Sequence, residues 1–375
     1  MTAQRQPLRG RKPGDRRVRI ERPHAAYFRY SGEGTLVAKE AASAPRTAFG
    51  RGYARVRAFL FGRPLSTHEE IGERLSKRKA LPIFSSDAIS SSAYATEEII
   101  RVLVLAGAVA LSASILLSAA IALLLTVVAL SYRQVCRAFP NGGGAYAVAR
   151  AELTPLIGLI AASALLIDYV MTVAVSTSSA LDQLASLVPA TGPIKVEIAI
   201  VAITLVTIAN LRGLRESGNI FMVPTYAFVV LALGVVGVGL ANIVTGHAAP
   251  LPAQPNAEPF GTTPLTVLLL LRAFAGGSVA LTGVEAIANG VPAFKPPEAK
   301  NAANTMIVMA TLLGVIFIGV SIVASAYRIV PSLGGYPSVI SLVAGAVYGT
   351  GTFLHGLFLV STMLILFLAV NTSYN

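Results

Sequence analysis

The chain has 375 residues, of which 54% are hydrophobic and 13% charged, with a formal net charge of +12. This composition is too apolar for a soluble domain of that size and predicts a polytopic, all-α membrane protein. The positive charge lies in a basic start and in short loops beside apolar runs, where membrane orientation and anionic lipid explain it, so nucleic acid is not an expected partner.

Residues 1–52 are rich in Arg, Gly and Pro, and they predict a largely disordered, basic cytoplasmic tail. Residues 53–80 have more helical character and are expected to lie along the cytoplasmic interface, with a loose linker as the alternative. Residues 81–375 form the predicted transmembrane transporter domain. The single cysteine excludes an internal disulfide.

Eight apolar segments are long enough to cross a bilayer, taking roughly twenty residues per crossing. They are 81–106, 113–135, 153–187, 196–211, 217–243, 265–291, 302–328 and 338–371. The loops after the second, fourth and sixth segments carry most of the Lys and Arg, which places the amino terminus in the cytoplasm of a bacterial-type cell membrane.

Two of these segments are interrupted. The first contains FSSDAISSSAYATEEI (Phe84–Ile99), and the sixth reads LLLLRAFAGGSVALTGVEAIANGVPAF, with Gly276, Gly277 and Gly283 at mid-membrane. Irregular backbone at this depth must be buried in protein or line a watery cavity. Breaks five segments apart predict an inverted-repeat transporter with its site at the midplane. The second repeat lacks two segments, so we expect a carboxyl-terminal truncation of a longer protein.

The presence of three carboxylates within the apolar segments requires an explanation, because each costs a few kcal/mol on insertion scales. They are Asp87, Asp168 and Glu285. The helical spacing of Asp168, Thr172, Ser176 and Ser179 places them on one face. Hydroxyls of this kind also mediate helix packing, which is the alternative for that stripe. Thr282 and Glu285 are expected to share a face at the start of a half-helix.

If the first segment unwinds near Ser85–Ser91, its carbonyls and hydroxyls, the Asp87 carboxylate and the Tyr94 hydroxyl can replace the hydration shell of a small cation. Oxygen ligands without Cys or His favour a hard cation. Tyr94 packing as an ordinary aromatic residue is equally compatible with its position. FPNGGGAY (Phe139–Tyr146) lacks the residues of a P-loop and predicts a tight turn or a re-entrant gate element. No motif indicates an enzyme or a resident cofactor.

Several stretches resemble the amino acid–polyamine–organocation superfamily, most closely its KimA-type branch of potassium importers. They are GRPLSTHEE, KALPIFSSDAISSSAYATEEI, FPNGGGAY, NLRGLRESG, PTY and LTGVEAIANGVPAFKPPEAKNA. The resemblance implies a LeuT-like fold, a homodimer and potassium uptake coupled to protons. It also implies the site residues: Asp87, Tyr94, Asp168, Tyr169, Thr172, Ser176 and Thr282 for the ion, and Glu285 for proton coupling.

Two other functions stay open. An amino acid or polyamine permease is the commoner activity in the superfamily. The first break contains Asp87 and no glycine, which disfavours a substrate carboxylate there and leaves a polycation as the better version of that alternative. A non-transporting membrane sensor of solutes is the third hypothesis.

Overall fold

A computed structural model describes residues 28–32, 35–38, 47–49, 74–211, 218–251, 254 and 256–374. The chain forms two compact units, Met1–Gly62 and Arg63–Asn375. In the first unit, strands β1 (Phe28–Gly32) and β2 (Thr35–Ala38) form an antiparallel hairpin that the sequence did not predict. The rest of the predicted tail, and the interfacial segment up to residue 73, lie outside the described residues except for residues 47–49.

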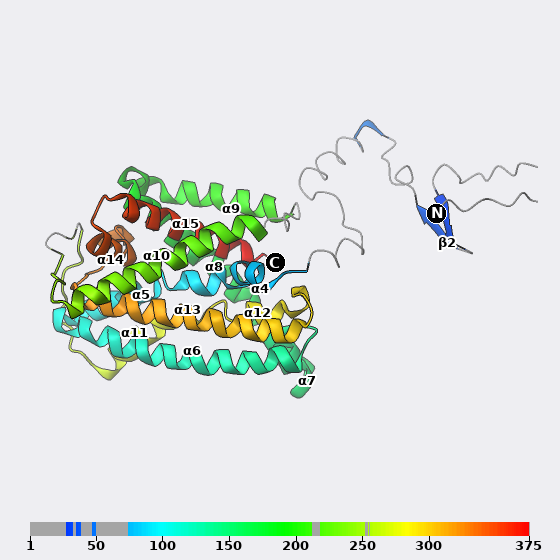
Figure 1. Ribbon diagram of the computed structural model, residues 1–375, viewed down its shortest axis with the longest axis horizontal. Helices are drawn as coiled ribbons and strands as arrows, with labels where there is room; N and C mark the ends of the chain where they lie inside the picture. Colours follow the sequence, from blue (N-terminus) through cyan, green and yellow to red (C-terminus); the bar gives the residue numbers. More distant parts are fainter. Residues whose placement is uncertain are drawn as a thin grey trace, which may run out of the picture. The chain divides into compact units, whose positions relative to one another are not determined.

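The second unit is a bundle of helices (Figure 1). Its α-helices are α4 (Lys77–Ser91), α5 (Ala95–Leu103), α6 (Ala113–Ala138), α7 (Gly144–Glu152), α8 (Pro155–Leu187), α9 (Lys195–Leu211), α10 (Gly218–Val244), α11 (Val267–Gly277), α12 (Ala286–Asn289), α13 (Glu298–Ala326), α14 (Val339–Tyr348) and α15 (Phe353–Thr372). Short 3-10 helices join several of them, namely η1 (Val104–Ala106), η2 (Ala108–Ser112), η3 (Pro189–Ile194), η4 (Ser278–Leu281), η5 (Val291–Ala293) and η6 (Leu333–Gly335).

Seven helical segments among the described residues are long and apolar enough to cross a membrane. They are Ala108–Ala138, Pro155–Leu187, Pro189–Asn210, Met222–Val244, Val267–Asn289, Glu298–Ala326 and Phe353–Thr372. Together with the interrupted pair α4 and α5, they correspond to the eight predicted segments. The prediction of an all-α polytopic membrane protein is therefore confirmed for this unit.

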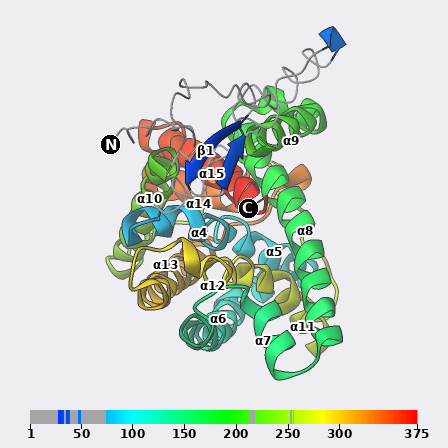
Figure 2. The ribbon, with the colours of Figure 1, turned by 90° about the vertical axis from the view of Figure 1, so that its right-hand side faces the viewer.

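The interrupted pair lies at the centre of the bundle. Every residue from Ser85 to Glu97 is buried, and α4 packs against α10, α13 and α15 (Figure 2). Burial in protein is what allows a membrane segment to contain a turn, because its free backbone groups are kept from lipid. By contrast, α8 and α9 expose most of their apolar side chains, as helices facing lipid or another membrane protein do.

The helical break of the first segment lies later than predicted. Residues Ser85–Ser91 are helical, and the turn occupies Ser92–Tyr94. Ser85 Oγ and Ser86 Oγ have no hydrogen-bond partner among the described residues, whereas the serines at the end of α4 bond back to carbonyls of their own helix: Ser90 Oγ donates to Asp87 O at 2.9 Å and Ser91 Oγ to Ala88 O at 2.6 Å. These bonds satisfy the carbonyls locally instead of freeing them for a ligand.

Two further expectations need correction. The eighth predicted segment is two helices, since Gly349 and Gly351 have positive φ and separate α14 from α15, and of the two only α15 is long enough to span. Thr282 does not begin a half-helix; its backbone is extended, and Gly283 follows with φ +76°. The residues Thr282–Glu285 therefore form the break itself, and Glu285 is the N-cap of the short α12.

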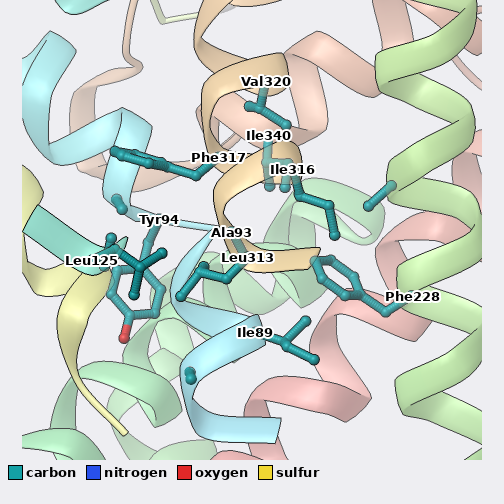
Figure 3. Close-up of a cluster of buried hydrophobic side chains, with 14 of the residues drawn as sticks. Ile89, Ala93, Tyr94, Leu125, Phe228, Leu313, Ile316, Phe317, Val320 and Ile340 are labelled. Atoms are coloured by element: carbon teal, nitrogen blue, oxygen red, sulfur yellow. The ribbon is translucent and has the colours of Figure 1, made fainter. Parts of the chain in front are cut away.

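The apolar core begins directly beside the first break. Ile89 and Phe228 are fully buried, and Phe228 stacks on Phe358 with ring centroids 5.9 Å apart. Figure 3 shows Tyr94 at the edge of this cluster, with its hydroxyl directed away from the labelled apolar side chains. The ring of Tyr94 thus packs in the apolar core, and its hydroxyl is available to a polar site.

Candidate ion site at the two helix breaks

The two broken segments touch each other at their breaks. Ser91 Oγ lies 3.3 Å from the Ala280 carbonyl oxygen, within hydrogen-bonding distance. Gly283 packs directly on Asp87, since a Cβ at this glycine would lie 2.6 Å from Asp87 Oδ2. Its positive φ also favours glycine. Both the backbone conformation and the lack of room for a side chain therefore favour glycine at this position.

Asp87 is the most deeply buried of the three predicted carboxylates. It lies in the last turns of α4 and is 4% exposed. Its Oδ1 has no hydrogen-bond partner among the residues that the structure describes. The carboxylate lies within electrostatic range of Glu285 and Asp168, both of which carry the same charge when ionised.

Tyr94 closes the turn between α4 and α5 and is 6% exposed. Its hydroxyl lies close to the hydroxyls of Thr282, in the second break, and Ser176, on α8. Thr282 Oγ1 donates to the Val279 carbonyl at 2.9 Å. Ser176 Oγ is near Tyr94 but has no hydrogen-bonding geometry to any of the described residues. Three elements far apart in the sequence thus contribute neighbouring hydroxyls.

Glu285 is buried at the amino end of α12, and its Oε1 has no hydrogen-bond partner in the described part of the chain. Its neighbours with ionisable groups come from three elements: Asp87 on α4, Asp168 and Tyr169 on α8, and Tyr132 on α6. In the part of the chain that the structure describes, no Lys, Arg or His forms an ion pair with Asp87 or Glu285. Any negative charge on these two carboxylates is therefore not compensated by a basic side chain of the described residues.

The α8 residues follow the predicted stripe. Thr172 and Ser176 are buried, while Asp168, Tyr169 and Ser179 are half-buried. The Tyr169 hydroxyl accepts a hydrogen bond from Asn289 Nδ2 at 2.9 Å. All eight predicted site residues therefore lie on α4, α8 or the two breaks.

Sequence reasoning missed Tyr132, Gly283 and Asn289, which line the same region. Gly283 was noted only as a breaker, although its closeness to Asp87 makes it part of the wall. Tyr132 and Asn289 carry a signal in hindsight, because each is a polar group within an apolar segment. Neither has the charge that drew attention to the carboxylates.

The donor set decides which ligands fit. Buried polar atoms in native proteins are nearly always paired, so unpartnered oxygens on Asp87, Glu285 and Ser176 call for an explanation. Carboxylate and hydroxyl oxygens suit a hard cation or a substrate ammonium group. Among the described residues, no three His, Cys, Asp or Glu side chains come together as a metal cluster, so the three carboxylates do not converge on one point.

Comparison with known proteins agrees with this geometry. A family model described as amino acid permease matches residues 75–374. The potassium transporter KimA of Bacillus subtilis is 42% identical over 323 residues, covering 86% of this chain and 53% of that protein. The low-affinity putrescine importer PlaP of Escherichia coli is 26% identical over 238 residues, covering 62% of this chain and 51% of that protein.

The chain spans about half the length of the curated relatives it matches. The family match nevertheless covers most of the chain and includes both helix breaks and α8. With its membrane-spanning helices, the protein is a multi-pass cell membrane protein. We conclude that this chain belongs to the amino acid permease family of the amino acid–polyamine–organocation superfamily.

Proposed function

We propose that the protein is a secondary transporter that imports potassium together with protons, and that it has no catalytic activity. The observation that carries this proposal is the buried, unpartnered Asp87 carboxylate oxygen at the meeting point of two helix breaks. A bare carboxylate in the middle of a membrane protein is costly, and a cation entering the site would offset that cost. The 42% identity to a potassium transporter supports potassium as the cation.

Each site residue has a proposed role. Asp87, Tyr94, Thr282 and Ser176 supply a carboxylate and hydroxyls for the ion at the breaks. Asp168, Tyr169 and Thr172 continue along α8 and attract or hold the ion on its path. Potassium is here the cargo of the protein and no resident cofactor is proposed.

Glu285 is the proposed proton carrier. Two neighbouring buried carboxylates cannot both ionise cheaply, because like charges and desolvation favour the neutral form of one of them. Asp168 and Asp87 lie within electrostatic range of Glu285, and no basic side chain pairs with it among the described residues. Proton occupancy of Glu285 and cation occupancy at Asp87 are thereby linked through charge, which is the requirement for coupled transport.

The topology and assembly complete the proposal. The distribution of Lys and Arg supports a cytoplasmic amino terminus. The exposed apolar side chains of α8 and α9 support contact with membrane lipid and with a second subunit in a homodimer.

Rubidium uptake tests the proposal directly. The full-length protein is expressed in a host deficient in potassium uptake, beside the Asp87→Asn variant. A matched control is Asp182→Asn, because Asp182 pairs with Lys195 at the other end of α8 and lies outside the site. Uptake and growth at low potassium should be lost in Asp87→Asn and retained in Asp182→Asn. Absence of uptake by the inserted wild-type protein would refute potassium import.

Polyamine import is the second candidate, favoured by the similarity to a putrescine importer. A dication with ammonium groups would also match a site of carboxylates and hydroxyls. The two functions are separated by measuring rubidium uptake with and without excess putrescine, and by measuring the uptake of labelled putrescine. Uptake of labelled putrescine, with no uptake of rubidium, would replace potassium by a polyamine as the cargo.

A further inference from the structure

Asn289 lies between the ion site and the loop that follows α6. It ends α12, and its backbone N–H donates to the Glu285 carbonyl at 2.9 Å. Its side-chain Nδ2 donates to the Tyr169 hydroxyl on α8, also at 2.9 Å. The residue therefore connects the helix that begins at Glu285 to a hydroxyl at the edge of the site.

The opposite side of Asn289 contacts three consecutive glycines, Gly142–Gly144, which we call the glycine loop. Gly143 N–H donates to the Asn289 carbonyl at 3.5 Å. A Cβ at Gly142 would lie 2.5 Å from that same carbonyl oxygen. A Cβ at Gly144 would collide with Asn289 Oδ1, which belongs to the same carboxamide that bonds Tyr169. Gly142 and Gly144 thus lie directly against Asn289, and Gly142 also lies against Pro292.

From these contacts we propose that Asn289 is a positioning residue that couples the glycine loop to the Tyr169 hydroxyl, so that the loop sets the geometry of the ion site. The inference rests on the proposed ion transport. It gives a function to FPNGGGAY, which the structure shows to be a turn followed by α7, with Gly142 N–H bonded to Phe139 O at 3.0 Å.

The carboxamide of Asn289 is suited to this connection because its nitrogen and its oxygen make different contacts. The amide nitrogen donates to Tyr169, while the oxygen fills the space that glycine leaves open at Gly144. The Tyr169 hydroxyl in turn lies within electrostatic range of Glu285, Asp168 and Asp87. Separation of the loop from α12 would remove the packing that holds the carboxamide, and Tyr169 would lose its donor.

All three glycines have positive φ, at +78°, +87° and +44° along the loop. Alanine at any of them is strained, so strain alone cannot distinguish the positions. Only the Gly144 position faces the Asn289 side chain, while Gly142 faces the Asn289 backbone and Gly143 faces Ala147 within α7. This difference supplies matched controls within a single loop.

The test is a double-mutant cycle between Gly144→Ala and Asn289→Ala, read as the initial rate of rubidium uptake per inserted protein. In the wild-type background, Gly144→Ala should lower the rate about tenfold, within the range found for directly coupled neighbours. In the Asn289→Ala background the obstruction is gone, and the further loss should fall to about twofold. Equal losses in both backgrounds would overturn the proposal.

Gly143→Ala and Gly142→Ala are the controls, and their losses should be the same with or without Asn289→Ala. Relief at all three positions would indicate general loosening of α12 and would also overturn the proposal. Should Gly144→Ala fail to accumulate in the membrane, the inserted amount becomes the measured quantity. Asn289→Ala must then restore it, and failure to do so counts against the coupling.

A second cycle separates positioning from a structural role. Asn289→Ala and Tyr169→Phe should each raise the KM for rubidium. The KM of the double variant should be no higher than that of the worse single variant, because both substitutions remove the same hydrogen bond. Loss of Vmax alone with an unchanged KM would show that Asn289 only supports the fold. No uptake by the wild-type protein would refute the transport proposal, whereas normal uptake with additive cycles would refute only this inference.

Discussion

Two buried carboxylate regions of this protein differ in what surrounds them. At the helix breaks, neither Asp87 Oδ1 nor Glu285 Oε1 has a hydrogen-bond partner among the described residues. On α5, Glu97 is as deeply buried, yet both of its oxygens are used: one accepts from Arg101 and the other accepts the Val339 N–H at 3.0 Å. Burial is therefore common to both regions, and spare bonding capacity is found in only one.

The contacts of Glu97 and Arg101 connect α5 to two other parts of the chain. Through Val339, Glu97 holds the first turn of α14, and Arg101 also lies 3.6 Å from Glu258 in the segment between α10 and α11. These contacts give Glu97 a structural explanation that needs no ligand. Of these three buried carboxylates, Asp87 and Glu285 each have an oxygen without a hydrogen-bond partner among the described residues, and the proposed site is centred on them and their neighbours.

The largest expected effect is that of Asp87→Asn on uptake. Removing the charge that faces the cation should lower rubidium uptake at subsaturating concentration by about 100-fold, since bonds to charged groups contribute about 1.5–3 kcal/mol. The melting temperature in detergent should stay equal or rise, because the variant removes an uncompensated buried charge. A marked fall in melting temperature would place Asp87 with Glu97 as a structural residue.

Glu285→Gln should change what drives uptake. In proteoliposomes, an imposed proton gradient is expected to accelerate rubidium uptake by the wild-type protein about tenfold or more, as coupling energies of 1–3 kcal/mol allow. The variant should transport at a rate independent of that gradient, because glutamine cannot exchange a proton. Proton dependence that survives in Glu285→Gln would assign the coupling to another group.

The charged residues of this site were the easiest to identify from the sequence. Asp87, Asp168 and Glu285 stand out because ionisable residues are rare and costly in apolar segments. The hydroxyl stripe on α8 follows from helical spacing alone, and Thr172 and Ser176 are buried on it as expected. Most segment boundaries also followed from hydropathy, because the bilayer fixes the length of each crossing.

Local bonding was harder to foresee. Ser90, Ser91 and Ser92 bond to carbonyls three residues earlier, and the break falls at the end of this serine run. Asn289 and the glycine loop meet only in the folded protein, as they are far apart in sequence. The inverted repeat and the cytoplasmic amino terminus stay predictions, and so does the role of each site residue.

Glu97→Gln should produce the opposite pattern to Asp87→Asn. It leaves Arg101 with a weaker partner and weakens the acceptor for Val339, so the free energy of unfolding should fall by about 1–3 kcal/mol. The melting temperature in detergent measures this, with exposed Glu152→Gln as the control. Rubidium uptake per folded protein should change much less than in Asp87→Asn. Equal loss of uptake in the two variants would remove the distinction between the regions.

The smallest expected effect separates two buried serines. Ser321 Oγ is hydrogen-bonded to both Thr96 Oγ1, at 2.9 Å, and Ser118 Oγ, at 2.8 Å, whereas Ser176 Oγ has no hydrogen-bond partner within the described ranges. Ser321→Ala should cost about 0.6–1 kcal/mol of stability, as interhelical hydrogen bonds in membranes do, and leave the KM for rubidium unchanged.

Ser176→Ala should do the reverse. Removing an unpartnered buried hydroxyl costs no hydrogen bond within the protein, so the melting temperature should not fall. If Ser176 instead contributes an oxygen to the ion, the KM for rubidium should rise by about three- to tenfold, the equivalent of one hydrogen bond to a charged group. A Ser176→Ala protein with lowered stability and an unchanged KM would show that this hydroxyl mediates helix packing, and the hydroxyl stripe on α8 would then lose its place in the ion site.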